Sequence, residues 1–263
     1  MSQYESVFAA SNRVALATIV VKEIRRFTRI WVQTLLPPAI TMTLYFVIFG
    51  NLVGRSISDM GGYSYMQFIV PGLIMMAVIT NSYANVVSSF FGAKFQRSIE
   101  EMLVAPVPHA TILAGFVLGG VARGLLVAVI VTLVSLFFTQ LSLHNVFVMV
   151  YSVLITAILF SLGGFINAVF AKTFDDVSLV PTFILTPLTY LGGVFYSMDV
   201  LSPFWQSVSL LNPIVYMVNA FRYGVLGHSD VNVFLSLLVM TVFTAGAYVV
   251  AYKLLKSGTG MRE

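Results

Sequence analysis

The residues whose spacing best predicts a role lie in segment 92–109, which reads GAKFQRSIEEMLVAPVPH. Ser98 and Glu101 fit a capping box, which predicts a short helix over 99–104 that Pro106 ends. One side of this helix is apolar and carries Ile99, Met102 and Leu103. A short capped helix between two long apolar segments can transmit force to a soluble partner. The simpler interpretation is a loop helix that only turns the chain around.

No other group of residues predicts catalysis or metal binding. The chain lacks the phosphate-binding pattern G-x-x-x-x-G-K-S/T and the zinc pattern H-E-x-x-H, and it has no cysteine. Its three histidines are far apart in predicted loops or at span ends: His109, His144 and His228. Asp175 and Asp176 are backbone neighbours, which favours a helix amino-terminal cap over an acid/base pair. We therefore expect no enzymatic activity, and no cofactor or metal in this chain.

Two apolar segments carry polar side chains at steps of three or four residues, which places each set on one helical face. The first set is Asn81, Asn85, Ser88 and Ser89, and the second is Thr182, Thr186 and Thr189. Polar groups in lipid are unfavourable unless satisfied, so each stripe should face protein or a water-accessible path. Helix–helix hydrogen bonding explains the spacing equally well. The same two segments contain Pro71, Pro181 and Pro187, which should kink them.

A further apolar segment predicts close helix packing around one charged residue. Its glycines lie four residues apart in two pairs, Gly115 with Gly119 and Gly120 with Gly124. Arg123 lies among them. A charge at the bilayer centre is costly, so we expect Arg123 near the membrane interface or paired with an acid.

The composition requires these apolar segments to lie in a membrane. Of the 263 residues, 59% are hydrophobic and 9% are charged, whereas a soluble domain carries roughly 25% charged residues. So few charges cannot cover a globule of this size, and the excess apolar surface needs lipid as its solvent. Membrane topology and contact with lipid explain the net charge of +4 better than nucleic-acid binding does.

The hydropathy pattern predicts an all-α integral membrane protein, a single domain over 1–263 with six transmembrane helices. The expected spans are 31–51, 65–91, 111–138, 146–170, 178–196 and 231–254. Most lysines and arginines fall on the side of the two termini, whereas the opposite loops hold only Arg55 and Arg222. The positive-inside rule therefore places both termini in the cytoplasm.

Two further segments accompany the spans. Segment 12–30 predicts an amphipathic elbow helix in the cytoplasmic interface, although a plain positive-inside anchor is an alternative. Its apolar face carries Leu16, Val20, Ile24 and Phe27 and continues to Trp31, and its basic face carries Lys22, Arg25, Arg26 and Arg29. Segment 197–230 is apolar but broken by Pro203 and Pro213, which predicts a re-entrant pair of short helices in the outer leaflet.

A spaced set of residues on the fifth expected span and the segment after it forms a signature. The set is Leu185, Leu188, Leu191, Gly192, Val194, Leu201, Ser202, Pro213, Ile214, Tyr216 and Arg222, and its clearest part is LNPIVYMVNAFRYG at 211–224. Together with EEMLVAPVP at 100–108, this signature resembles that of the ABC-2 type transporter permeases, the membrane subunits of bacterial exporters. Segments such as MQFIVPGLIMM, AKTFDD and TPLTYLGGVFYS narrow the resemblance to one branch of this family.

The resemblance implies a permease subunit in the bacterial cytoplasmic (inner) membrane that moves an amphipathic, lipid-linked, saccharide or drug-like substrate outward. Two copies of a separate ATPase, which binds ATP and Mg²⁺, would lie beneath a permease homodimer. The residues that would couple to the ATPase are Ser98, Ile99, Glu100, Glu101, Met102, Leu103, Lys172, Asp175 and Asp176. Spans two and five would line the dimer interface, and their polar stripes the translocation path. The outer gate would include Pro213, Tyr216 and Arg222.

Two other classes of membrane protein remain open. A secondary transporter driven by an ion gradient normally needs intramembrane acids, and only Arg123 is a plausible buried ionisable residue from the sequence. A membrane scaffold that transports nothing is the other alternative. The capped cytoplasmic helix favours the exporter permease.

Overall fold

The computed structural model describes residues 2–54 and 60–260, and the side chains of residues 12–50, 54 and 60–260. Arg55 lies outside the described residues. The described chain is helical and contains no strand, which confirms the all-α prediction. Five helices in this part of the chain are long and apolar enough to cross a membrane. They are Trp31–Gly50, Tyr65–Phe95 (α4), His109–Ser135 (α6), Val146–Phe170 (α7) and Val233–Ser257 (α12).

The first of these five is built from successive helical pieces. It consists of α2 (Trp31–Thr34), α3 (Leu36–Tyr45) and the π-helical η1 (Phe46–Val53). Of the residues in its most apolar 18-residue stretch, only 17% are buried inside the protein, and the same fraction holds for α12. Both helices therefore leave most of their surface for lipid or for another chain.

The segment expected to be the fifth span, 178–196, is not one helix long enough to cross a membrane. It contains α8 (Phe174–Val180), the π-helical η2 (Pro181–Leu185) and α9 (Thr186–Tyr190) in succession. Pro181 is the first residue of η2 and Pro187 lies in the first turn of α9, because proline lacks an N–H group and disturbs the preceding turn. In contrast, Pro71 does not divide its helix, because α4 continues on both sides of it.

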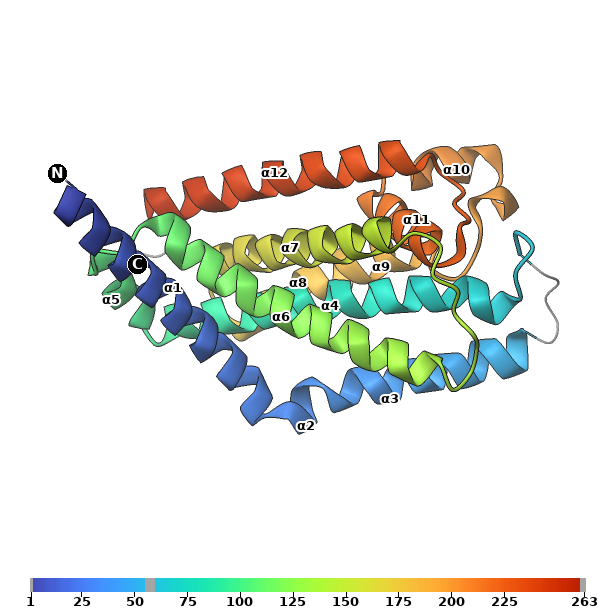
Figure 1. The fold of residues 1–263 in the computed structure, drawn as a ribbon, viewed down its shortest axis with the longest axis horizontal. Coiled ribbons are helices and arrows are strands. Elements are labelled where there is room, and N and C mark those ends of the chain that lie inside the picture. The colour runs from blue at the N-terminus through green and yellow to red at the C-terminus, as the bar shows by residue number, and fades with distance from the viewer. Residues whose placement is uncertain (1, 55–59, 261–263) are drawn as a thin grey trace.

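The central element of the bundle is α4, which packs most extensively against α7 and α6 (Figure 1). Of the residues in the most apolar 18-residue stretch of α4, 83% are buried. The Phe90 ring of α4 lies 5.2 Å from Phe116 of α6 and 4.3 Å from Phe165 of α7, between ring centroids. Between helices in lipid, close packing of this kind replaces the hydrophobic driving force available in water. With so much of α4 enclosed by its own chain, only a small part of its surface is left for a second copy.

The two ends of the bundle carry different elements (Figure 1). One end holds α5 (Ser98–Val104), the start of α1 (Ser2–Arg29) and the end of α12. The other end holds η3 (Met198–Val200), α10 (Pro203–Ser209) and α11 (Pro213–Leu226). We call them the α5 end and the α11 end. The two short helices expected within 197–230 are thus present as α10 and α11.

The helix α1 packs against α6 through a face that is shifted from the one expected. Among its described side chains, those of Ile19, Glu23 and Phe27 are buried at four-residue steps, whereas Trp31 just beyond it is 56% exposed. A Cβ atom at Gly119 of α6 would lie 2.5 Å from the Cβ of Glu23. The glycines therefore mark close helix packing as predicted, and α1 packs against Gly115 and Gly119.

Candidate functional site

The short helix α5 is confirmed, but its amino-terminal cap differs from the predicted capping box. The residue before the helix is Arg97, at φ 60°, and it makes no side-chain capping bond. Ser98 is already helical, and its hydroxyl donates to the carbonyl of Ala93 at 3.2 Å. The left-handed residue lets the chain leave α4 and enter α5 immediately. The capping-box prediction is therefore wrong, although the helix that it indicated exists.

Helix α5 presents one side to the protein and the other to its surroundings. Ile99 is 1% exposed, and Met102 and Leu103 pack partly buried against the core. Glu100 and Glu101 are exposed, and Val104 is 88% exposed. The helix is therefore anchored by its apolar side, as predicted, and leaves two carboxylates and one apolar side chain exposed.

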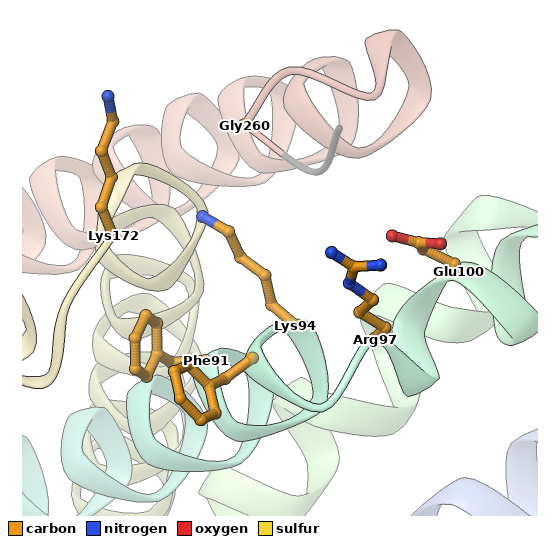
Figure 2. A pocket seen from close by; sticks show the side chains of 7 residues that line it. Phe91, Lys94, Arg97, Glu100, Lys172 and Gly260 are labelled. Atoms are coloured by element: carbon orange, nitrogen blue, oxygen red, sulfur yellow. The ribbon is translucent and has the colours of Figure 1, made fainter. Parts of the chain in front are cut away.

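A cavity of about 410 Å³ adjoins α5 (Figure 2). Its lining comprises Phe91, Lys94, Phe95, Arg97, Glu100, Lys172 and Gly260. Lys94 donates from Nζ to the carbonyl oxygens of Val169 and Ala171, at 2.8 and 2.7 Å, which joins α4 to the end of α7. The structure therefore brings Glu100 of α5 and Lys172 of the loop before α8 to one cavity, as expected if both contact the same partner.

The amino terminus of α8 is closed by a capping box of Thr173, the residue before the helix, and Asp176, so one of the two adjacent aspartates contributes to the cap as predicted. The Asp176 carboxylate accepts from the backbone N–H groups of Lys172 and Thr173, each at 2.9 Å, and the Asp176 N–H donates to the Thr173 hydroxyl. These bonds to the charged form lower the pKa of Asp176 below its usual 3.8. Asp175 is exposed in the same turn. The cap fixes the loop that carries Lys172.

The polar stripe of α4 faces helix α1 and a buried acid that the sequence analysis did not identify. Glu23 is 0% exposed, and its carboxylate accepts from the Ser89 hydroxyl at 2.6 Å and from Arg26 Nε at 3.3 Å. Arg26 also donates to the backbone and side-chain oxygens of Asn85, both at 2.9 Å, and to the Ser88 hydroxyl at 3.4 Å. The stripe thus binds α1 to α4 in this conformation.

The remaining residue of the α4 stripe, Asn81, binds Arg123, which the sequence predicted near the membrane interface or paired with an acid. Arg123 donates from Nη2 to Asn81 Oδ1 at 3.1 Å and to the Thr34 carbonyl at 3.2 Å. The charge is therefore hydrogen-bonded to neutral oxygens on α4 and α2. Asn81 donates in turn to the carbonyl of Ala77 at 2.9 Å.

The threonine stripe lies on the broken helix formed by α8, η2 and α9. Thr182 and Thr186 are exposed, whereas Thr189 is 2% exposed. Thr186 and Thr189 donate to the carbonyls of Pro181 and Leu185 in their own helix. Among the described residues, no hydrogen bond joins this stripe to that of α4.

At the α11 end, a second buried charge cluster holds the expected outer-gate arginine. Arg222 is 0% exposed and stacks over the Phe68 ring at 3.8 Å. It donates to the carbonyls of Phe68 and Gly193 at 3.3 and 2.7 Å, and its Nη1 lies 4.0 Å from Asp230 Oδ2. Asp230 also accepts from the Ser197 hydroxyl at 3.0 Å. The cluster therefore ties α11 to α4 and to the loop that precedes α10.

The other two residues expected at the outer gate shape the same segment. Pro213 occupies the first turn of α11, and the Tyr216 hydroxyl donates to the Leu210 carbonyl at 2.8 Å. His228 lies 3.0 Å from Asp230 between Nε2 and Oδ1, so this histidine has a carboxylate neighbour that the sequence analysis did not find. Glu23, Arg222 and Asp230 also correct the expectation that only Arg123 would be a buried ionisable residue.

The fold and the described sites agree with a comparison to known families. The model of the ABC-2 type transporter family matches residues 14–226. The chain belongs to this family, whose members are membrane subunits of transporters and not enzymes. Membership implies partnership with an ATP-binding-cassette ATPase subunit.

Individual relatives narrow the family to one branch. The chain is 64% identical over 250 residues to the inner membrane transport permease YadH of Escherichia coli strain K12, which covers 95% of this chain and 98% of that protein. Nodulation protein J of Neorhizobium galegae is 21% identical over 214 residues, 81% of this chain and 82% of the relative. These similarities confirm the predicted family and branch. The chain is a multi-pass protein of the bacterial inner membrane.

Proposed function

We propose that the chain is the permease subunit of an ATP-driven exporter, with the α5 end in the cytoplasm. The observation that carries this proposal is α5 itself. It is anchored by Ile99 and presents Glu100, Glu101 and Val104 outward, beside a cavity that also includes Lys172. An ATPase docked there would push on α4, because α5 follows α4 directly and packs against it.

In this proposal, movement of α4 is passed to α1 through the buried acid. Glu23 and Arg26 bind Ser89 and Asn85 on the half of α4 nearer to α5. The elbow helix would then move with α4 and not as a separate anchor. A path along the α4 stripe would open only when these bonds rearrange, because Asn81, Asn85 and Ser89 are buried here.

In this proposal two copies of the chain form a homodimer, and the second half of the translocation path lies where they meet. The broken helix of α8, η2 and α9 would complete a sixth crossing, and its exposed Thr182, Phe183 and Thr186 would face the second copy. At the other end, α10 and α11 would re-enter the outer leaflet, with the Arg222 cluster as a fixed support of the outer gate. The cargo proposed is amphipathic, lipid-linked, saccharide or drug-like.

The alternative of a secondary transporter depends on acids available to an ion. Two buried acids in the described part of the chain form ion pairs with arginine. The Glu23 carboxylate lies 3.3 Å from Arg26 Nε, and the Asp230 carboxylate lies 4.0 Å from Arg222 Nη1. Their pairing favours a structural role and counts against an ion site.

Mild-detergent purification of the tagged chain from its own host tests the proposal. We expect a stoichiometric soluble protein with a phosphate-binding loop, and ATP hydrolysis by the complex. Transport assays in inside-out vesicles should then show ATP-dependent uptake, equivalent to export. A well-folded preparation without a partner, active on an ion gradient alone, would contradict the proposal.

A further inference from the structure

Among the described residues that line the cavity beside α5, basic side chains outnumber acidic ones. Lys94, Arg97 and Lys172 line it, with Glu100 as the acid among its lining residues. Lys94 is held by two carbonyl oxygens at the end of α7, so this wall is tied to a long helix. A concave site with clustered basic groups attracts an anion.

The left-handed backbone of Arg97, which turns the chain from α4 into α5, also places this arginine at the cavity. Among the described residues, Arg97 is the one non-glycine residue with a positive φ, at 60°. Such a conformation is uncommon for a side-chain-bearing residue and is often found at binding sites. Here it sets the arginine on the rim of the cavity, between Lys94 and Glu100 (Figure 2).

Exposed aromatic side chains border the cavity on one side. Phe174 lies 5.0 Å from Phe91 and 5.1 Å from Phe95 between ring centroids, and Phe95 and Phe174 are 63% and 64% exposed. Such apolar rings are unfavourable in water and are favoured on the acyl-chain side of the boundary between lipid headgroups and hydrocarbon. The long helices α4 and α7 both end beside the cavity, which is consistent with that level of the membrane.

We propose that this cavity binds the phosphate of an anionic phospholipid of the inner membrane, with an acyl chain along Phe95 and Phe174. Basic pockets between membrane helices at the cytoplasmic side are suited to such headgroups. An acidic segment of the ATPase would match the charge as well, but it would not account for the exposed rings. The lipid would contact both sides of the turn between α4 and α5, beside the proposed docking helix.

The test compares lipid binding by the full-length chain and two double variants in mild detergent, by native mass spectrometry. Phosphatidylglycerol and phosphatidylcholine serve as probes. In Arg97→Asn with Lys172→Gln, asparagine tolerates the left-handed backbone and so preserves the turn. The matched control is Lys253→Gln with Lys256→Gln, which removes the same charge from the exposed end of α12.

We expect the unmodified chain to retain phosphatidylglycerol in preference to phosphatidylcholine. Each basic residue near a membrane surface contributes about fivefold, so the cavity variant should bind phosphatidylglycerol about thirtyfold more weakly. The control should bind it as the unmodified chain does. Equal binding of both lipids, or equal weakening in the control, would overturn the assignment.

Two further arms separate a lipid from other anions and from a protein. Phosphatidylglycerol should raise the melting temperature of the unmodified chain, whereas inorganic phosphate should not; equal stabilisation by phosphate would show that a free anion is the ligand. This arm also decides the matter if the cavity variant does not fold. A variant that keeps its lipid but loses the ATPase would show a protein docking site instead. Lipid retention is measured without ATP, so this assignment and the exporter proposal fail independently.

Discussion

The two ends of the bundle differ in where their charged side chains find partners. At the α11 end, Arg222 and Asp230 have side chains that are 0% exposed and bind helices and loops of the same chain. At the α5 end, Glu100, Glu101 and Lys172 are exposed, and Glu100 and Lys172 line a cavity. Charges buried together fix one arrangement, and removing one partner is costly. The comparison indicates a self-contained α11 end and an α5 end available to other molecules.

The largest effect should come from removing the central charge of the α11 end. Arg222→Ala leaves Asp230 without its arginine, and we expect a loss of about 3–5 kcal/mol in the free energy of unfolding. Denaturant unfolding in mixed micelles measures it. The control Arg29→Ala, on the exposed face of α1, should change the value by less than about 0.5 kcal/mol. A similar small loss in both variants would remove the contrast between the ends.

The buried acid of α1 should rank second. Glu23→Ala takes the partner from Arg26 and the acceptor from Ser89, and we expect a loss of about 2–3 kcal/mol. The control is Glu101→Ala, which removes an exposed carboxylate, measured in the same unfolding experiment. Equal destabilisation by the two substitutions would show that the joint between α1 and α4 contributes little.

Charge reversal on α5 should affect transport and leave folding intact. For Glu100→Lys combined with Glu101→Lys, we expect ATP-dependent transport to fall at least about tenfold, equivalent to about 1.4 kcal/mol of coupling. The unfolding free energy should change little because both side chains are exposed. Lys253→Glu with Lys256→Glu is the matched reversal elsewhere. Normal transport with the ATPase still bound would exclude α5 as the coupling element.

The cap of α8 should give the smallest effect, and one that depends on pH. Because the pKa of Asp176 is lowered from 3.8, its ionised cap stabilises the fold above that value and is lost as pH falls through the lower folded-state pKa. Asp176→Asn should therefore melt at a lower temperature than the unmodified chain near neutral pH. Melting curves at decreasing pH should show this gap closing below pH 3.8. A gap that persists in acid would show that the charge is not responsible.

The sequence predicts long elements better than local backbone geometry. The helices α4, α6, α7 and α12 follow from long apolar runs, and α5 follows from a short amphipathic stretch between charged residues and prolines. The backbone geometry at the start of α5 could not be predicted, because the capping-box pattern of Ser98 and Glu101 is also compatible with a left-handed residue at Arg97. The apolar run 178–196 predicts a continuous fifth span, but Pro181 and Pro187 disrupt its regular helical bonding.

Charged residues that become buried were the hardest to predict. A glutamate on a basic amphipathic helix suggests solvent exposure, and Glu23 lies beside Lys22. The available signal was its four-residue spacing from Ile19 and Phe27, which places all three on one face. Asp230 lies in a loop beyond α11, and only the tertiary fold brings it to Arg222.

Site-specific photo-crosslinking in the native host tests the functional difference between the ends most directly. The crosslinker is placed at Val104 of α5, which is 88% exposed, or at Leu211 beside α11, which is 82% exposed. We predict a covalent adduct with a soluble ATPase that carries a phosphate-binding loop from Val104 and none from Leu211. No ATPase adduct from Val104, or equal adducts from both positions, would contradict the assignment of the α5 end as the docking surface.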